Sequence, residues 1–198
     1  MYLRQRLQRL AHNDDEGGVR TKSVKRVRRP KKLVLLFSLI QENKRMNHLV
    51  QINISKGGVP KLPVEETFVT TLGLHGDKQK DKRYHGGVDR AVCLFSTQII
   101  AQLQNEGHPI YAGSTGENLT IAFENYHDLK PGVILQIGDE VQIQIMSYAA
   151  PCKTIKQFFL NELFIRISQK LYPQQSRLYA KVLKEGSIRK GDSLIIKA

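Results

Sequence analysis

Gly73–Arg90 reads GLHGDKQKDKRYHGGVDR and leads directly into the apolar segment Ala91–Phe95. The polar stretch holds four glycines, three aspartates and two histidines and almost no apolar residue. A glycine-rich loop that enters a core strand is a common place for binding groups. The pair Gly86-Gly87 lets the backbone approach a ligand and can offer consecutive N–H groups to an anion. By itself the composition fits both a ligand-binding loop and an ordinary surface excursion.

A second stretch places a cysteine at the end of a strand. Val141–Ile145 alternates apolar and polar residues, which predicts a half-buried strand with its isoleucines inward. The strand is followed by Ala149–Thr154, where Pro151 prevents continuation of the ladder and Lys153 brings a positive charge that favours the thiolate form of Cys152. The alternative is that this cysteine is a small buried apolar residue.

These stretches belong to an ordered series of short motifs. The series is G-L-x-G-D at 73–77, Q-x-D at 79–81, H-G-G-x-D-R-A-V at 85–92, G-E-N-L at 116–119, P-C at 151–152 and G-D at 191–192. In this order the motifs resemble the MOSC domain, a family that comprises the C-terminal domain of molybdenum cofactor sulfurases and small stand-alone bacterial proteins. The resemblance covers about Asn47 to Lys197. One departure stands out: many relatives carry an arginine just before the Pro-Cys pair, whereas this chain has Ala149 and Ala150 there.

The resemblance implies a ligand and a set of site residues. The ligand is the molybdenum cofactor (molybdopterin), with Cys152 as the catalytic residue and molybdenum ligand. The cofactor-binding residues implied are His75, Asp77, His85, Gly86, Gly87, Asp89, Arg90, Glu117, Asn118 and Lys153. Arg90 and Lys153 are the cations expected at the phosphate.

Two functions from different classes remain open at this point. Small stand-alone relatives suggest reduction of N-hydroxylated small-molecule substrates, with electrons from a separate reductase. The alternative is a non-redox sulfur carrier or cofactor-delivery module that uses a Cys152 persulfide. Residue type alone would also allow His75 with Asp77, or Asp81 with His85, to bind a metal. Their spacing matches no standard zinc pattern, and turn capping explains the aspartates equally well.

Composition narrows the class of protein. A length of 198 residues with 40% hydrophobic content suits one domain with a sizeable core. The longest apolar run, Leu33–Ile40, is far short of the ~20 residues that span a membrane, so we expect no membrane association. Cys93 and Cys152 are too few for a disulfide framework and too far apart for a C-x-x-C metal site, which favours a reducing cytoplasm.

The net charge of +13 is concentrated at one end of the chain. Residues 1–32 contain eleven Lys and Arg against three acids, a net charge of +8, and the remainder contains twenty against fifteen, a net charge of +5. Because the basic segment Lys22–Lys32 lacks aromatic residues for base stacking, we do not expect a nucleic-acid partner. We expect residues 1–45 to be a disordered basic extension or an upstream translated segment, and 46–198 to be the folded domain.

Periodicity and turn residues predict the elements of that domain. Strands are expected over Leu49–Ile54, Val64–Thr71, Ala91–Phe95, from Gly116–Leu119 onward, and over Val133–Ile137, Val141–Ile145, Leu178–Leu183 and Leu194–Ile196. Ser96 is expected to cap a helix with Ile99, Ile100 and Leu103 on one face. A second helix is expected where Leu163, Phe164, Ile167 and Leu171 recur at helical spacing. Many short strands and few helices predict a mostly β, closed or nearly closed antiparallel barrel with peripheral helices.

Overall fold

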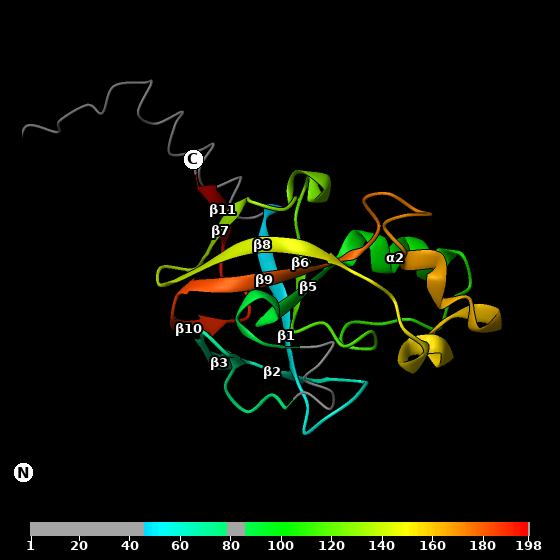
Figure 1. The fold of residues 1–198 in the computed structure, drawn as a ribbon, viewed down its shortest axis with the longest axis horizontal. Coiled ribbons are helices and arrows are strands. Elements are labelled where there is room, and N and C mark those ends of the chain that lie inside the picture. The colour runs from blue at the N-terminus through cyan, green and yellow to red at the C-terminus, as the bar shows by residue number, and fades with distance from the viewer. Residues whose placement is uncertain (1–45, 79–85, 198) are drawn as a thin grey trace, which may run out of the picture.

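The structure is a computed structural model that describes residues 46–78 and 86–197 (Figure 1). The predicted basic extension, residues 1–45, therefore lies outside the described residues, as does His85. Within the described part, no helix has the length and apolar composition needed to cross a membrane.

The fold is mostly β, as the sequence predicts. The described strands are β1 (His48–Ile54), β2 (Leu62–Val64), β3 (Glu66–Thr70), β4 (Gly73–Leu74), β5 (Val92–Ser96), β6 (Leu119–Ala122), β7 (Ile134–Ile137), β8 (Val141–Ala149), β9 (Arg177–Lys184), β10 (Gly186–Arg189) and β11 (Leu194–Lys197). They form an eight-stranded sheet in the order β11-β7-β8-β9-β5-β6-β1-β2 and a three-stranded sheet in the order β10-β3-β4. Neighbouring strands pair antiparallel except β5 and β6, which are parallel.

The expected closed or nearly closed barrel is not confirmed. In the larger sheet, β11 and β2 are the edge strands of an open order. A single bridge joins His48 at the start of β1 to Ser193, and the Leu49 N–H donates to the Asp192 carbonyl oxygen at 2.8 Å. These contacts hold the two ends of the sheet near one another without a continuous ladder between them.

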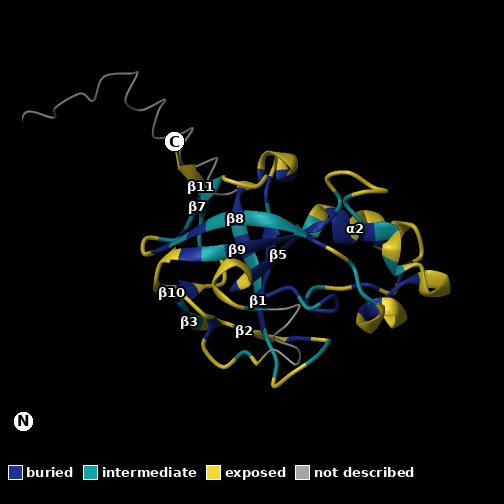
Figure 2. Cartoon of the chain, viewed as in Figure 1, coloured by how far each residue is buried: buried dark blue, intermediate teal, exposed yellow. Residues whose placement is uncertain are grey.

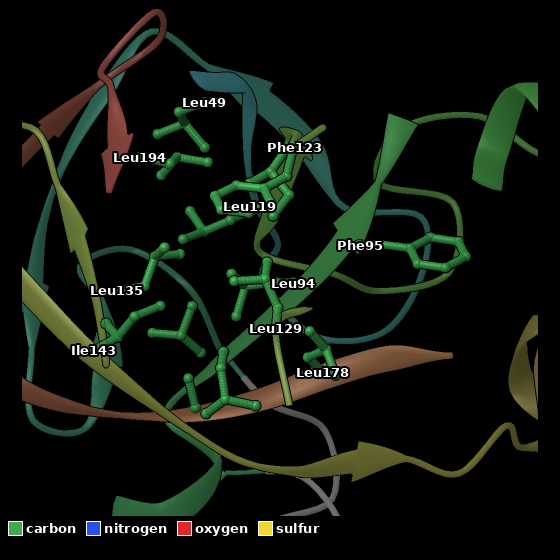
Figure 3. Close-up of a cluster of buried hydrophobic side chains, with 14 of the residues drawn as sticks. Leu49, Leu94, Phe95, Leu119, Phe123, Leu129, Leu135, Ile143, Leu178 and Leu194 are labelled. Carbon is green, nitrogen blue, oxygen red and sulfur yellow. The ribbon is translucent and has the colours of Figure 1, made fainter. Parts of the chain in front are cut away.

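The apolar faces of the strands make one core. Val141, Ile143 and Ile145 of β8 are completely buried, which confirms the inward isoleucines predicted from the alternation. Leucines from strands that are far apart in the sequence, among them Leu49 and Leu119, lie in the same cluster (Figure 3). This core fixes the strand ends from which the functional loops leave.

The predicted helix after Ala91–Phe95 is confirmed as α2 (Thr97–Asn105). The Ser96 hydroxyl accepts hydrogen bonds from the backbone N–H groups of Gln98 and Ile99, and thereby satisfies donors that the first helical turn cannot. Ile99, Ile100 and Leu103 are buried, as expected for the face that packs on the sheet.

The second predicted helix is wrong. The chain between β8 and β9 instead forms three short 3₁₀ turns: η3 (Lys153–Phe158), η4 (Leu160–Glu162) and η5 (Phe164–Ile167). Ser168 has φ −80° and ψ 123°, an extended conformation that ends η5 inside the expected helix. Asn161 and Glu162, with φ values of 53° and 57°, prevent a right-handed helix from running into Leu163 from the preceding residues. Leu163 is exposed while Ile167 is fully buried, so the apolar residues do not share one face. Figure 2 shows the exposed outer side of these turns beyond α2.

The predicted strand Val64–Thr71 is confirmed over Glu66–Thr70, which is β3, whereas Val64 is the last residue of β2 in the other sheet. β2 pairs with β1 in the larger sheet, and β3 pairs with β10 in the smaller one. The chain changes sheet at Glu65, between them. Pro63 lacks an N–H group and lies in the edge strand β2, where a proline is tolerated.

Candidate functional site

A cavity of about 850 Å³ opens where loops from the first and second halves of the domain meet the sheet. Its volume is in the range of sites that bind cofactors and other small molecules. The two stretches singled out in the sequence both reach it: Lys78, Gly86 and Arg90 line it from one, and Pro151 and Cys152 from the other.

Cys152 lies at the exit of β8 and is half-buried. β8 ends at Ala149, and Cys152 directly precedes the 3₁₀ turn η3. Its Sγ lies 2.7 Å from the Thr154 Oγ1, and Thr154 also lines the cavity. The thiol is free and reaches the cavity from a short turn that the strand holds in place.

Cys93 belongs to the same cavity but in a different state. It lies in β5 with 5% of its surface exposed, and burial raises the pKa of its thiol to about 11. Tyr179 and Ala149 pack beside it. Burial also raises the pKa of the Tyr179 hydroxyl, and the Arg90 guanidinium carbon lies 5.9 Å from the centre of the Tyr179 ring. The Cys93 thiol is therefore a buried part of the cavity wall.

Asp77 holds the first part of the predicted loop in place. Its carboxylate accepts hydrogen bonds from the Ser55 N–H at 2.8 Å and from Asn118 Nδ2 at 2.9 Å, and it forms an ion pair with Lys61. Asn118 and Lys61 line the cavity, whereas Asp77 lies behind them. Asp77 is therefore a positioning residue for this wall.

Glu117, expected to bind the cofactor, is fully buried and does not line the cavity. Its carboxylate accepts hydrogen bonds from the Gly113 N–H at 2.5 Å and from the hydroxyls of Thr115 at 2.8 Å and Thr120 at 3.1 Å. The oxygens are used within the turn that presents Thr115 and Gly116. Direct contact of Glu117 with a cofactor stays a prediction, because its side chain is used within the fold in this structure.

Four other predicted residues are exposed and are absent from the cavity lining. They are His75, Gly87, Asp89 and Lys153. His75 follows the two-residue strand β4, and Asp89 lies in the short turn η1 (Val88–Arg90). The resemblance to the MOSC domain implied them, and their contact with a cofactor stays a prediction.

Arg177 is the cavity residue that sequence reasoning missed. It begins β9 and pairs with Ala149 in the β8–β9 ladder, although the two are far apart in the sequence. It is 3% exposed and lines the cavity. The sequence held one indication, because Arg177 directly precedes the strand predicted from Leu178. Only the pairing register of β8 with β9, however, places Arg177 beside the Pro-Cys turn.

The described lining is strongly basic. It contains Lys61, Lys78, Arg90 and Arg177, and the described residues contribute no aspartate or glutamate to it. Across residues 46–78 and 86–197, no three His, Cys, Asp or Glu side chains gather in a way that could hold a metal ion. The arrangement can therefore bind an anionic ligand beside one accessible thiol.

The chain is similar to known proteins over much of its length. The chain is 29% identical over 140 residues to the uncharacterized protein YflK of Bacillus subtilis (strain 168), an alignment that covers 69% of this chain and 62% of that protein. It is 28% identical over 134 residues to a protein named "Reductase" from Gibberella moniliformis, which covers 64% of this chain and 23% of that protein. The chain thus spans less than two thirds of the length of these curated relatives.

The fold is also known from crystal structures. YiiM from Geobacillus stearothermophilus superimposes with a TM-score of 0.62 at 26% identity, covering 77% of this chain and 75% of that chain. The family profile described as the MOSC domain matches residues 81–195, which is more than half of the chain and includes the Pro-Cys turn, both cysteines and β9. The chain therefore belongs to the MOSC domain family.

Proposed function

We propose that this chain binds the molybdenum cofactor in the 850 Å³ cavity, with the Cys152 thiolate as a molybdenum ligand, and works as a reductase component for N-hydroxylated small molecules. MOSC domains are associated with molybdenum-cofactor proteins, which makes this cofactor the first candidate. The observation that carries the proposal is an accessible thiol at a basic, cofactor-sized cavity.

The described residues fit the group chemically. Thiolate sulfur is a soft ligand that suits a molybdenum centre. Four basic lining residues and no described acid suit a ligand with a phosphate and further anionic oxygens. Asn118 adds a side-chain amide to the wall, and its Nδ2 is already oriented by Asp77. Both cysteines are free thiols, which is the state that a reducing compartment such as the cytoplasm favours and that a thiolate ligand requires.

When bound, the cofactor would supply two-electron redox chemistry, and the chain's own residues do the rest. Cys152 would hold the metal, and the basic residues of the cavity wall would hold the anionic part. Reduction of an N–OH group to N–H consumes an electron pair and protons and releases water. We propose that a separate reductase supplies the electrons, and the relative named "Reductase", in which the matching region is under a quarter of the protein, supports such a pairing.

The sulfur-carrier alternative uses the same cysteine without the rest of the cavity. A persulfide on Cys152 needs neither 850 Å³ of space nor four basic residues. The geometry therefore favours a bound cofactor, and the two functions separate in one experiment.

The test is elemental and pterin analysis of protein purified from a host that makes the cofactor. We expect molybdenum and pterin in about equal amounts in the wild type, loss of molybdenum in Cys152→Ser, and full retention in Cys93→Ala. Cyanide-releasable sulfur without molybdenum would instead identify the carrier. Full molybdenum content in folded Cys152→Ser would refute thiolate ligation.

A further inference from the structure

Arg177 is a buried cation that has more N–H donors than hydrogen-bond partners. Its Nη1 donates to the Thr115 carbonyl oxygen, and its Nη2 donates to the Ala150 carbonyl oxygen at 3.3 Å. The Nε–H is buried and has no hydrogen-bond partner in the described structure. A guanidinium carries five N–H donors, so most of this group's capacity is unused.

No carboxylate of residues 46–78 and 86–197 forms an ion pair with this guanidinium. Among the described residues, Lys61 has Asp77 as its ion-pair partner, and no ion pair includes Arg177. Glu117 is linked to Arg177 only through Thr115, which accepts from Arg177 with its carbonyl and donates to Glu117 with its hydroxyl. A charge that is 3% exposed and unpaired is costly unless something compensates it.

The position of Arg177 is set by strand pairing. The two residues just before the Pro-Cys pair are Ala149 and Ala150, which carry no charge. The β8–β9 register sets Arg177 opposite Ala149, and its guanidinium contacts Ala150. Strand β9 thus delivers a buried cation to the Pro-Cys turn, whose own cation, Lys153, is exposed and lies outside the cavity lining.

We propose that Arg177 is the anion-recognising residue of this cavity and binds a phosphate-type oxyanion between the Thr115–Gly116 turn and the Pro151–Cys152 turn. The proposal deepens the proposed function and rests on the cavity being its binding site. The oxyanion has two possible sources, the phosphate of the cofactor or an anionic group of the substrate. A purely structural arginine would hold the two carbonyls and respond to no anion.

The experiment uses full-length protein made in a host that lacks the cofactor, with inorganic phosphate as the probe and chloride at matched ionic strength as the reference. We expect phosphate to slow iodoacetamide alkylation of Cys152 and to raise the melting temperature relative to chloride. In Arg177→Gln, the phosphate concentration for half-protection should rise at least about tenfold, the loss expected for one charge-assisted hydrogen bond. Arg177→Lys keeps the charge and should give an intermediate value.

Arg189→Gln is the matched control, because Arg189 is exposed and paired with Glu66 outside the cavity. Phosphate should protect Cys152 in this variant as it does in the wild type. If Arg177→Gln does not fold by circular dichroism, Arg177→Lys against Arg189→Lys carries the comparison. Absence of phosphate protection in the wild type, or unchanged protection in the folded Arg177 variant, overturns the proposal.

A second arm identifies the source of the oxyanion. In protein from a cofactor-making host, loss of pterin from Arg177→Gln assigns the oxyanion to the cofactor. Retained pterin together with lost phosphate protection assigns it to the substrate. Because the first arm uses protein without cofactor, phosphate can protect Cys152 even if the molybdenum analysis of the wild type comes out negative, and the two ideas fail separately.

Discussion

The two cysteines should differ in reactivity by two orders of magnitude or more in the folded protein. Burial raises the pKa of Cys93 from 9.0 to about 11. At neutral pH this lowers its thiolate fraction roughly a hundredfold relative to an ordinary thiol, to about one molecule in ten thousand. Cys93 is also only 5% exposed, whereas Cys152 is half-buried at the cavity mouth. Alkylation should therefore mark Cys152 first.

The assay is timed iodoacetamide labelling of native protein at pH 7, with peptide mass spectrometry to follow each cysteine. Cys93→Ala and Cys152→Ser assign the signals, and labelling in urea shows the intrinsic rates, which should become similar. Because the thiolate fraction of Cys93 rises about tenfold per pH unit below its pKa, its slow rate should climb steadily toward pH 11. If Cys93 in the folded protein reacts at a rate within tenfold of Cys152 at pH 7, the reasoning from burial is wrong.

Three further outcomes follow from the same structure. Because the pKa of Cys93 is higher in the folded than in the unfolded protein, its shift contributes on the order of 3 kcal/mol to the free energy of unfolding below pH 9, and this contribution is lost as pH rises through 11. Urea melts should therefore show a loss of stability at high pH that is smaller in Cys93→Ala. Glu117→Ala leaves three buried donors without their acceptor and should cost about 3 kcal/mol or more in urea unfolding, whereas an unchanged midpoint would show that the turn does not need it. Deleting residues 1–45 should change the free energy of unfolding by less than about 2 kcal/mol, and a larger loss would show that Leu33–Ile40 buries apolar side chains on the domain.

Local patterns predicted the elements whose causes are local. The alternation of Val141–Ile145 identified β8 because a half-buried strand buries every second residue. Ser96 identified the start of α2 because its hydroxyl is the acceptor that the first turn lacks. In both places the deciding interactions lie within a few residues.

The predictions failed where distant partners decide the outcome. The change of sheet at Glu65 depends on β10, which contacts β3 from the other end of the chain. The expected helix after Cys152 had suitable apolar spacing, but Ser168, between Ile167 and Leu171, adopts an extended backbone that ends η5. Helical periodicity carries no information about such a break.

The candidate site divides along the same line. Cys152 was singled out at the exit of a predicted strand and Asn118 through the family resemblance, and both line the cavity. The same resemblance implied that Glu117 binds the cofactor, whereas in the structure its oxygens accept hydrogen bonds within the turn itself. Arg177 carries no motif, and only the pairing of β8 with β9 brings it to Cys152.

The β8–β9 ladder has a consequence for how this protein can diversify. Cys152 follows the last residues of β8, Arg177 opens β9, and the ladder locks Ala149 to Arg177 across the excursion between them. The entropic cost of closing such a loop rises by only about 0.6 kcal/mol for each doubling of its length. Insertions and deletions in the exposed residues Lys170–Gln174 can therefore accumulate while the thiol and the guanidinium keep their relative positions. The excursion is the part of the chain in which homologous proteins can reshape access to the cavity without rebuilding it.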